Sequence, residues 1–209
     1  SWHAVLADYF DSLPIWTESG EAGRDPTMRR ASELCFHLSH AGQDDRLVFA
    51  LTNFESLLAR LLGTGTPGLE EDFTVAAADE LKLGSRAPGI DLIAGAVRLA
   101  ALELQKAPGQ LHVQLFGRLS ASDAPEVDTL LQSTRAWQQG PWLRPRWPCF
   151  DSPGGTEVRC LDGGVGHVLD VVTTPDEQHI VSVKGGPAYA VELWEIETGR
   201  RLLTMKAKS

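Results

Sequence analysis

Two histidines have a spacing that could serve a metal ion. His37 and His40 stand three residues apart in a segment with helical periodicity, so both imidazoles would lie on one helix face. Cys35 is close in sequence, but at about 100° per residue it points roughly 160° away from His37. Zinc sites use three or four protein ligands. We therefore expect His37 to pack or cap within a helical hairpin, and a helical hydrolase or metal enzyme built on His37 and His40 is the alternative.

Two glycine-rich segments lack the context of a nucleotide site. Residues 63–68 are not followed by the lysine and hydroxyl residue that a phosphate-binding loop requires. Residues 163–166 precede a predicted strand, whereas a dinucleotide-binding loop precedes a helix. The acidic segments 44–45 and 70–72 are expected in first turns of helices, where they complement the helix dipole. We expect no catalytic residue, no cofactor, no bound metal and no enzymatic activity in this chain.

A segment rich in tryptophan and arginine is the main candidate for binding. Trp142, Arg144, Arg146 and Trp147 stand close together among prolines. Basic residues interleaved with aromatic rings can hold a nucleic-acid strand. However, the net charge of −9 argues against binding to a phosphate backbone. We expect the arginines to stack over tryptophans or to pair with helix acids, in an interaction strap whose partners are proteins and not nucleic acid.

The composition is that of an ordinary globular protein. The 209 residues are 43% hydrophobic and 22% charged. Three scattered cysteines fit reduced thiols in the cytoplasm better than a disulfide framework. No apolar run approaches the roughly 20 residues of a membrane helix, and no signal peptide opens the chain. We expect a cytoplasmic protein without membrane contact, and the missing initiator Met predicts that the sequence is cut from a longer chain.

Residues 1–137 have the periodicity of about eight helices. Asp25-Pro26 predicts a helix start and Gly42 the end of that helix. Asp44-Asp45 predicts a short helix through residue 51, and Asn53 can cap the next helix. Residues 63–68 are predicted to interrupt the pattern before a short helix over 69–78. The apolar stripe of the first helix consists of Trp2, Val5, Leu6, Tyr9, Phe10 and Leu13. Together these segments predict helical hairpins in an α-solenoid-like array.

The C-terminal residues 158–209 have the pattern of a β-meander. The predicted strands cover Val168 to Val172, Ile180 to Val183, Val191 to Ile196 and Arg201 to Met205. Turn residues at 174–177 and 197–200 separate them. With Trp194-Glu195 in place of a Trp-Asp dipeptide, this order resembles one WD-repeat propeller blade. Residues 138–157 would form the strap that delivers the chain to the first blade strand at Val158.

The blade departs from the usual repeat in its polar residues. In intact WD repeats a histidine, a serine, an aspartate and a tryptophan form a buried hydrogen-bond network. Here only Ser182 and Trp194 stand at matching positions, and Gly164 replaces the histidine. Because a half-satisfied buried network is less favourable than none, we expect this blade to pack by apolar contact alone.

The resemblance extends over nearly the whole chain. The segments that carry it are Leu6 to Phe10, Glu33 to Gly42, Leu115 to Leu119, Pro141 to Pro145 and Ser152 to Gly155. In this order they resemble the helical spacer of bacterial NACHT or NB-ARC proteins with WD repeats. These STAND-type NTPases are relatives of the apoptotic protease-activating factor, in which a helical arm joins a nucleotide-switched ATPase to a sensing propeller. The resemblance implies an ATPase domain upstream of this chain and further propeller blades downstream.

Three functions are open at this point. The preferred hypothesis is a non-catalytic module that couples the ATPase to the propeller in a signalling or defence protein. The second is the stand-alone hydrolase or metal enzyme of His37 and His40. The third is a helical scaffold that docks a partner whatever the nucleotide state.

Overall fold

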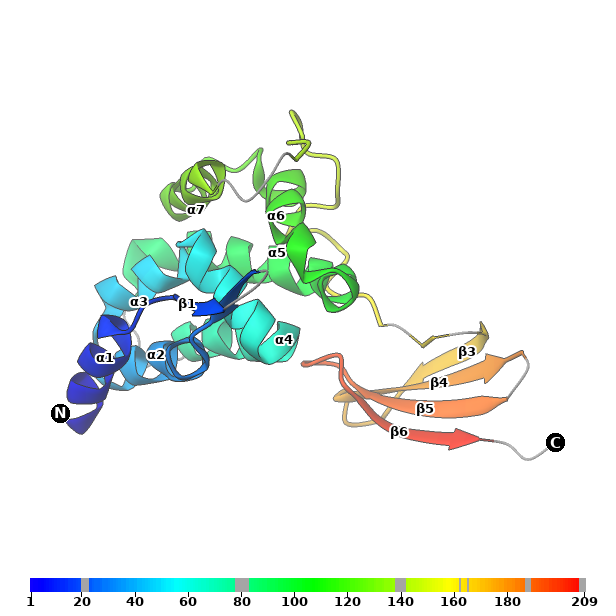
Figure 1. The fold of residues 1–209 in the computed structure, drawn as a ribbon. Coiled ribbons are helices and arrows are strands. Elements are labelled where there is room, and N and C mark those ends of the chain that lie inside the picture. Colours follow the sequence, from blue (N-terminus) through cyan, green and yellow to red (C-terminus); the bar gives the residue numbers. More distant parts are fainter. Residues whose placement is uncertain are drawn as a thin grey trace. The chain divides into compact units, whose positions relative to one another are not determined.

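The computed structural model is mostly helical and ends in a small antiparallel sheet (Figure 1). This confirms the predicted fold class. The structure describes residues 1–19, 23–77, 83–137, 142–161, 163–164, 166–186 and 189–206. The predicted helix end at residue 78 and the predicted start of the strap at 138–141 lie outside these residues. The chain divides into a helical unit, Ser1–Val158, and a blade unit, Arg159–Ser209.

Helix α1 (Trp2–Ser12) buries only part of its apolar stripe. Ala7 and Phe10 lie in the core, at 0 and 5% exposure. The exposed residues of the stripe are Trp2 at 72%, Val5 at 60% and Tyr9 at 56%. Three of the six stripe residues are therefore exposed and do not lie in the core. The side of α1 that faces the core is centred on Ala7 and Phe10. The apolar stripe covers a wider part of the helix surface than this buried side.

A β-hairpin lies where the sequence predicted a helix start. Strand β1 (Trp16–Ser19) pairs antiparallel with β2 (Gly23–Pro26). Helix α2 (Met28–His40) begins only after this hairpin. The prediction that Asp25-Pro26 opens the helix is therefore wrong, because Asp25 pairs with Thr17 in extended conformation. Proline is tolerated there because it is the last residue of an edge strand.

The next helices follow the predicted caps. Helix α2 ends before Gly42, whose φ of 67° is in the left-handed region. Helix α3 (Asp44–Leu51) has the predicted bounds, and the Asn53 side chain caps α4 (Phe54–Ala76) through a backbone N–H at 3.0 Å. The glycine-rich run interrupts α4, as predicted. Gly65 has non-helical φ 72° and ψ −176°, so α4 consists of two helical segments joined at a kink.

Helices α5 (Ala87–Lys106), α6 (Leu111–Leu119) and α7 (Pro125–Ala136) complete the helical unit. Short 3-10 turns over Gly84–Arg86 and Pro108–Gln110 precede α5 and α6. The largest fully buried side chains are Phe54, Phe116, Leu38, Leu47, Leu51, Leu57, Leu69, Ile90, Ile93, Leu104, Leu111 and Leu115. They come from α2 to α6, so one hydrophobic core runs through the helices.

Across the described ranges, no single helix is long and apolar enough to cross a membrane. Helices α3 and α4 meet that length and composition only together, as a pair bent by 77°. Most of the apolar side chains of α4 are buried in the helical core.

The blade unit contains a four-stranded meander in the order β3-β4-β5-β6. Its strands are β3 (His167–Thr173), β4 (His179–Gly185), β5 (Ala190–Glu195) and β6 (Arg201–Lys206). The first predicted turn closes with a hydrogen bond from Glu177 N to Thr174 O at 2.8 Å. The prediction of a blade strand at Val158 is wrong, because the first strand begins at His167. The residues before it lead into glycines with positive φ at 164 and 166.

Candidate functional site

Trp142 packs the strap against α6. Its ring centroid lies 4.6 Å from that of His112 and 5.4 Å from that of Phe116. Burial lowers the pKa of His112, which favours the neutral imidazole, and its ring packs against the indole of Trp142. Trp142 therefore belongs to the inner face of the strap.

Two glycines let the strap approach the helices closely. The N–H groups of Cys149 and Phe150 donate to Gly117 O of α6, at 3.0 and 3.1 Å. A Cβ on Gly117 would lie 2.2 Å from the Phe150 ring, and a Cβ on Gly95 of α5 would lie 2.7 Å from Pro153. Any larger residue at either glycine would displace the strap, because these distances are far below van der Waals contact.

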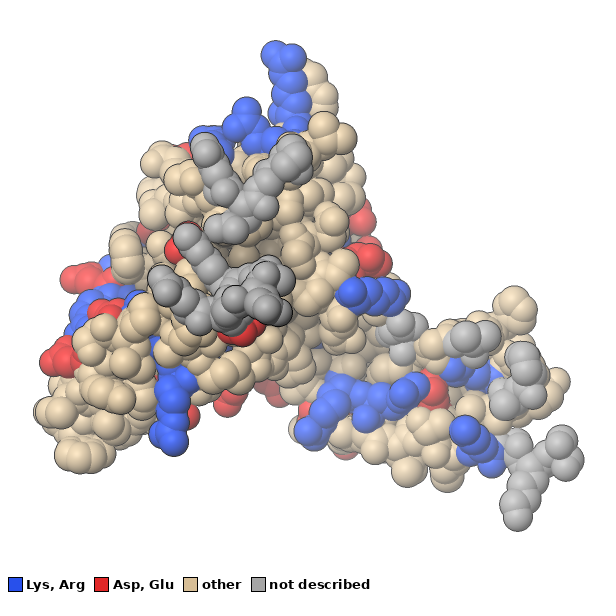
Figure 2. Space-filling model, viewed as in Figure 1, with Lys and Arg blue, Asp and Glu red and all other residues tan. Residues whose placement is uncertain are grey.

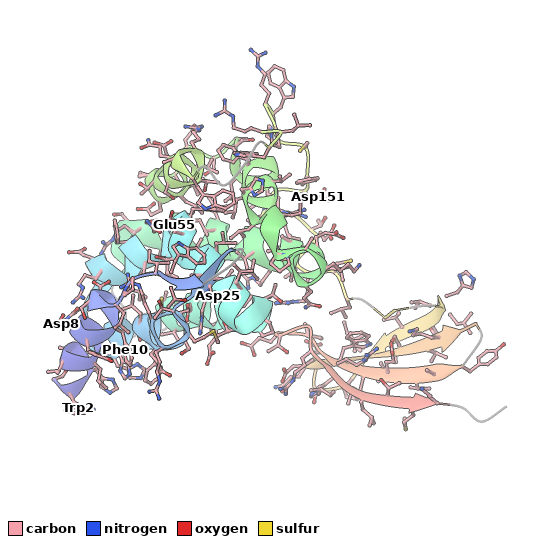
Figure 3. The ribbon with its side chains drawn as sticks, in the orientation of Figure 1. Trp2, Asp8, Phe10, Asp25, Glu55 and Asp151 are labelled. Atoms are coloured by element: carbon pink, nitrogen blue, oxygen red, sulfur yellow. The ribbon has the colours of Figure 1, made fainter. Side chains whose placement is uncertain are left out.

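Arg118 ties the strap to two helices. Its guanidinium donates to Asp151 O at 2.8 Å and to Leu99 O at 3.3 Å, and its Nε donates to Gln114 Oε1 at 3.3 Å. The same guanidinium lies 5.4 Å from the Phe150 ring centroid. Figure 3 shows Asp151 on the strap beside this end of the helical unit. Hydrogen bonds from a charged group are stronger than neutral ones, so Arg118 is the main polar anchor of the strap.

The outer face of the strap combines apolar and basic side chains. Arg146 lies 5.3 Å from the Trp147 ring centroid, whereas Arg144 lies 5.9 Å from that of Phe116. Leu143 and Trp147 expose 92 and 69% of their surface. In Figure 2, lysines and arginines gather at one end of the helical unit. Of the four predicted strap residues, Arg146 and Trp147 lie together on the surface, while Trp142 and Arg144 pack against the helix.

A cleft lies between α5 and the last residues of the strap, next to the contact of Gly95 with Pro153. Its volume is about 620 Å³, within the range of small-molecule sites. The charged residues that line it are Asp91, Arg98 and Glu157. It is a second candidate surface in the helical unit.

Ser182 and Trp194 form a buried pair in the blade. The Trp194 indole Nε1 donates to Ser182 Oγ at 3.0 Å, and the two residues are 5 and 7% exposed. Alternation along β4 and β5 puts both side chains on one face of the sheet. The two residues that match the repeat pattern are therefore joined as that pattern requires.

A cluster of charged residues extends the pair on the same face. Glu192, 2% exposed, accepts a hydrogen bond from Arg201 Nη1 at 2.8 Å and lies 3.6 Å from Lys184 Nζ. Its other oxygen, Oε2, has no hydrogen-bond partner among the described residues. The prediction that the blade packs by apolar contact alone is wrong, because the buried face is polar.

The sequence reasoning missed Lys184 and Glu192. Each stands two residues from a member of the predicted pair, so the two-residue period of a strand places them on the same face as Ser182 and Trp194. That period was the available signal. The sequence reasoning also missed Gly95 and Gly117. A glycine inside a helical stripe does not indicate which residues will pack against it.

The structure places His37 beside His3 of α1. Their Nδ1 atoms are 2.9 Å apart, and the His40 ring stacks on the His3 ring with centroids 5.0 Å apart. Burial and the neighbouring His3 lower the pKa of His37. Cys35 lies elsewhere, where it lines a pocket together with Arg60 and Asp72. Within the described ranges, no group of three or more His, Cys, Asp or Glu could hold a metal ion.

Comparison with known proteins links the chain to one kind of multidomain protein. It is 27% identical over 194 residues to NACHT domain- and WD repeat-containing protein 1 of Mus musculus, an alignment that covers 88% of this chain. The chain spans 12% of the length of that relative. No protein-family model and no solved structure matches the chain. The likeness supports a relation to proteins with NACHT domains and WD repeats, and does not bear on a bacterial origin.

Proposed function

We propose that this chain is a non-catalytic coupling module of a cytoplasmic signalling or defence protein. In this role the helical unit joins an upstream nucleotide-switched ATPase to a WD-repeat propeller, and the blade unit is the first part of that propeller. The likeness to a protein with a NACHT domain and WD repeats supports the two neighbours. Its surfaces would bind protein partners and would not bind substrates.

The observation that carries the proposal is the anchored strap. Gly95, Gly117 and Arg118 hold residues 149–153 against α5 and α6. The chain passes from the helical unit to the blade unit at Val158, only five residues after Pro153. A displacement of α5 and α6 would therefore move the point at which the chain enters the blade unit.

The exposed face of the blade is consistent with further blades. The register places Val172, Val181, Leu193 and Leu203 in one row across the four strands. Val172 and Leu203 expose 53 and 49% of their surface. A sheet with an uncovered apolar row is suited to packing against another sheet.

Nucleotide hydrolysis tests the non-catalytic assignment. This chain alone should not hydrolyse ATP or GTP, whereas the longer protein with its ATPase domain should. Hydrolysis by this chain, resistant to further purification, would overturn the assignment.

Hydrogen exchange of the longer protein tests the coupling. Exchange in residues 159–206 should differ between the ATP and ADP states by at least about threefold. Gly117→Val should abolish the difference by displacing the strap, and Arg146→Met, a change on the outer face, should preserve it. The coupling role is rejected if wild type shows no nucleotide-dependent difference.

One observation favours the scaffold hypothesis as a second candidate. Trp2, Val5 and Tyr9 form an exposed apolar side of α1, and such surfaces often bind proteins. Binding of a purified partner that is lost in Val5→Asp but equal in the ATP and ADP states would favour a scaffold over a coupling module.

A further inference from the structure

The kink in α4 has a local cause in the sequence. Gly65 adopts φ 72° and ψ −176°, a conformation that is essentially restricted to glycine. Pro67 has no N–H to donate to the preceding turn. A Cβ on Gly68 would lie 2.1 Å from Thr64 Oγ1, so the bend also needs a residue without a side chain at 68. Three residues thus set up the bend between a first segment, Phe54–Thr64, and a second segment, 66–76.

Arg60 connects the two segments across this bend. Its Nε donates to Gly68 O at 3.1 Å, and its Nη2 donates to Asp72 Oδ1 at 2.8 Å. Arg60 and Asp72 are 6 and 5% exposed. On α4, Glu71 is the other acid near Arg60, at 3.7 Å. From α2, Cys35 lines the same pocket as Arg60 and Asp72.

The contact between Arg60 and Asp72 exists only in the bent helix. In a regular α-helix, side chains three or four positions apart are neighbours. Residues twelve positions apart are separated along a straight axis by about 18 Å. Straightening α4 would therefore break both bonds of Arg60 and leave a buried guanidinium and a buried carboxylate without each other.

We propose that α4 is a two-segment hinge and that the Arg60–Asp72 pair is the latch that keeps it bent. With the latch closed, the second segment is fixed against the first. With the latch open, rotation about the backbone of Gly65 would let residues 66–76 reorient. The use of this hinge as the moving joint of the coupling module rests on the proposed function, but the latch itself is a property of this chain alone.

Hydrogen exchange measured on the 209-residue chain tests the latch. Asp72→Asn should accelerate exchange in residues 66–76 by at least about tenfold and leave 54–63 and 87–106 within about twofold of wild type. Asp45→Asn is the matched control. Asp45 lies on α3, pairs with Arg86, and has a side chain that is 94% exposed. Its replacement should leave the exchange rate of residues 66–76 unchanged. Equal acceleration in all segments, or none, would overturn the proposal.

A paired replacement keeps the test valid if Asp72→Asn does not fold. Arg60→Met with Asp72→Met removes both buried charges, a change that proteins often tolerate without loss of stability. If the ion pair is the latch, this variant should fold and still exchange at least about tenfold faster in residues 66–76. Wild-type protection there would show that the bend needs no latch. Since the experiment uses no nucleotide, its outcome is separate from that of the coupling test.

Discussion

The two units bury charged side chains in different ways. In the helical unit, the buried Arg60 meets a buried partner, Asp72, and a backbone carbonyl. In the blade unit, Arg201 and Lys184 share one oxygen of Glu192, and the other oxygen has no hydrogen-bond partner among the described residues. The first arrangement is a pair of opposite charges that connects the two segments of α4. The second is an incomplete cluster on the face where the WD-repeat pattern would have its own network.

The apolar surroundings of the two clusters differ as well. The helical pair lies in a unit with many large, fully buried side chains. In the blade unit, Ala190 and Trp194 are the buried hydrophobic residues of the described part. Stability in the blade unit therefore depends more on its polar residues, whereas the helical unit can lose a polar contact and keep its core.

The largest effect is expected from Glu192→Gln. This change keeps the shape of the side chain but leaves Lys184 buried without its counter-charge, which costs roughly 3–5 kcal/mol for a broken buried pair. Urea denaturation combined with hydrogen exchange of residues 179–195 would measure the loss. Glu197→Gln, in an exposed turn of the same unit, is the control and should shift the midpoint little. A loss of unfolding free energy below about 1 kcal/mol for Glu192→Gln would show that the charged cluster contributes little to the stability of the blade unit.

A smaller effect is expected from Ser182→Ala. The indole N–H of Trp194 would then be buried without an acceptor, at a cost of about 1–3 kcal/mol. Ser182→Thr keeps the hydroxyl and should lose less. If Ser182→Ala destabilised the blade as much as Glu192→Gln, the charged cluster and the hydrogen-bonded pair would contribute equally, contrary to the comparison above.

Acid should weaken the helical unit through His37. Because burial and His3 lower its pKa, the folded chain favours neutral imidazole: this stabilisation is complete above the ordinary value of 6.5 and is lost as the pH falls below it. Burial raises the pKa of Asp72 to about 6, so its contribution has the opposite sign, present below 3.8 and lost as the pH rises through about 6. Urea midpoints of wild type and His37→Asn between pH 7.5 and 5.5 separate the contribution of His37 from that of Asp72, because both proteins retain Asp72. The wild type should lose more stability over this range, and parallel curves would contradict the assignment to His37.

Features set by neighbouring residues could be predicted from the sequence. Asn53 and Gly42 mark helix ends because capping depends on a few adjacent backbone groups. The strand pattern also identified Ser182 and Trp194 as the two positions that match the repeat, although their hydrogen bond was not predicted.

Features set by packing between distant segments could not be predicted. The strand at Asp25 depends on its pairing with Thr17, and the inward side of α1 depends on where α2 lies. The approach of the strap to Gly117 likewise depends on residues about thirty positions away. For the same reason the sequence showed an interruption at Gly65 but not the Arg60–Asp72 contact that closes the bend.

The smallest effect, and the one with the opposite sign, is expected from Gly163→Ser. A Cβ at this position would lie 3.5 Å from Glu192 Oε2, in ordinary contact, and the φ of Gly163 is not in the left-handed region. The serine hydroxyl can donate to the carboxylate oxygen that has no other hydrogen-bond partner among the described residues, a gain of about 0.5–1.5 kcal/mol. Gly163→Ala is the matched control, because it makes the same change in backbone freedom without a donor. A higher urea midpoint for the serine variant than for the alanine variant would show that the blade cluster lacks one donor, and equal midpoints would show that Glu192 is already satisfied in solution.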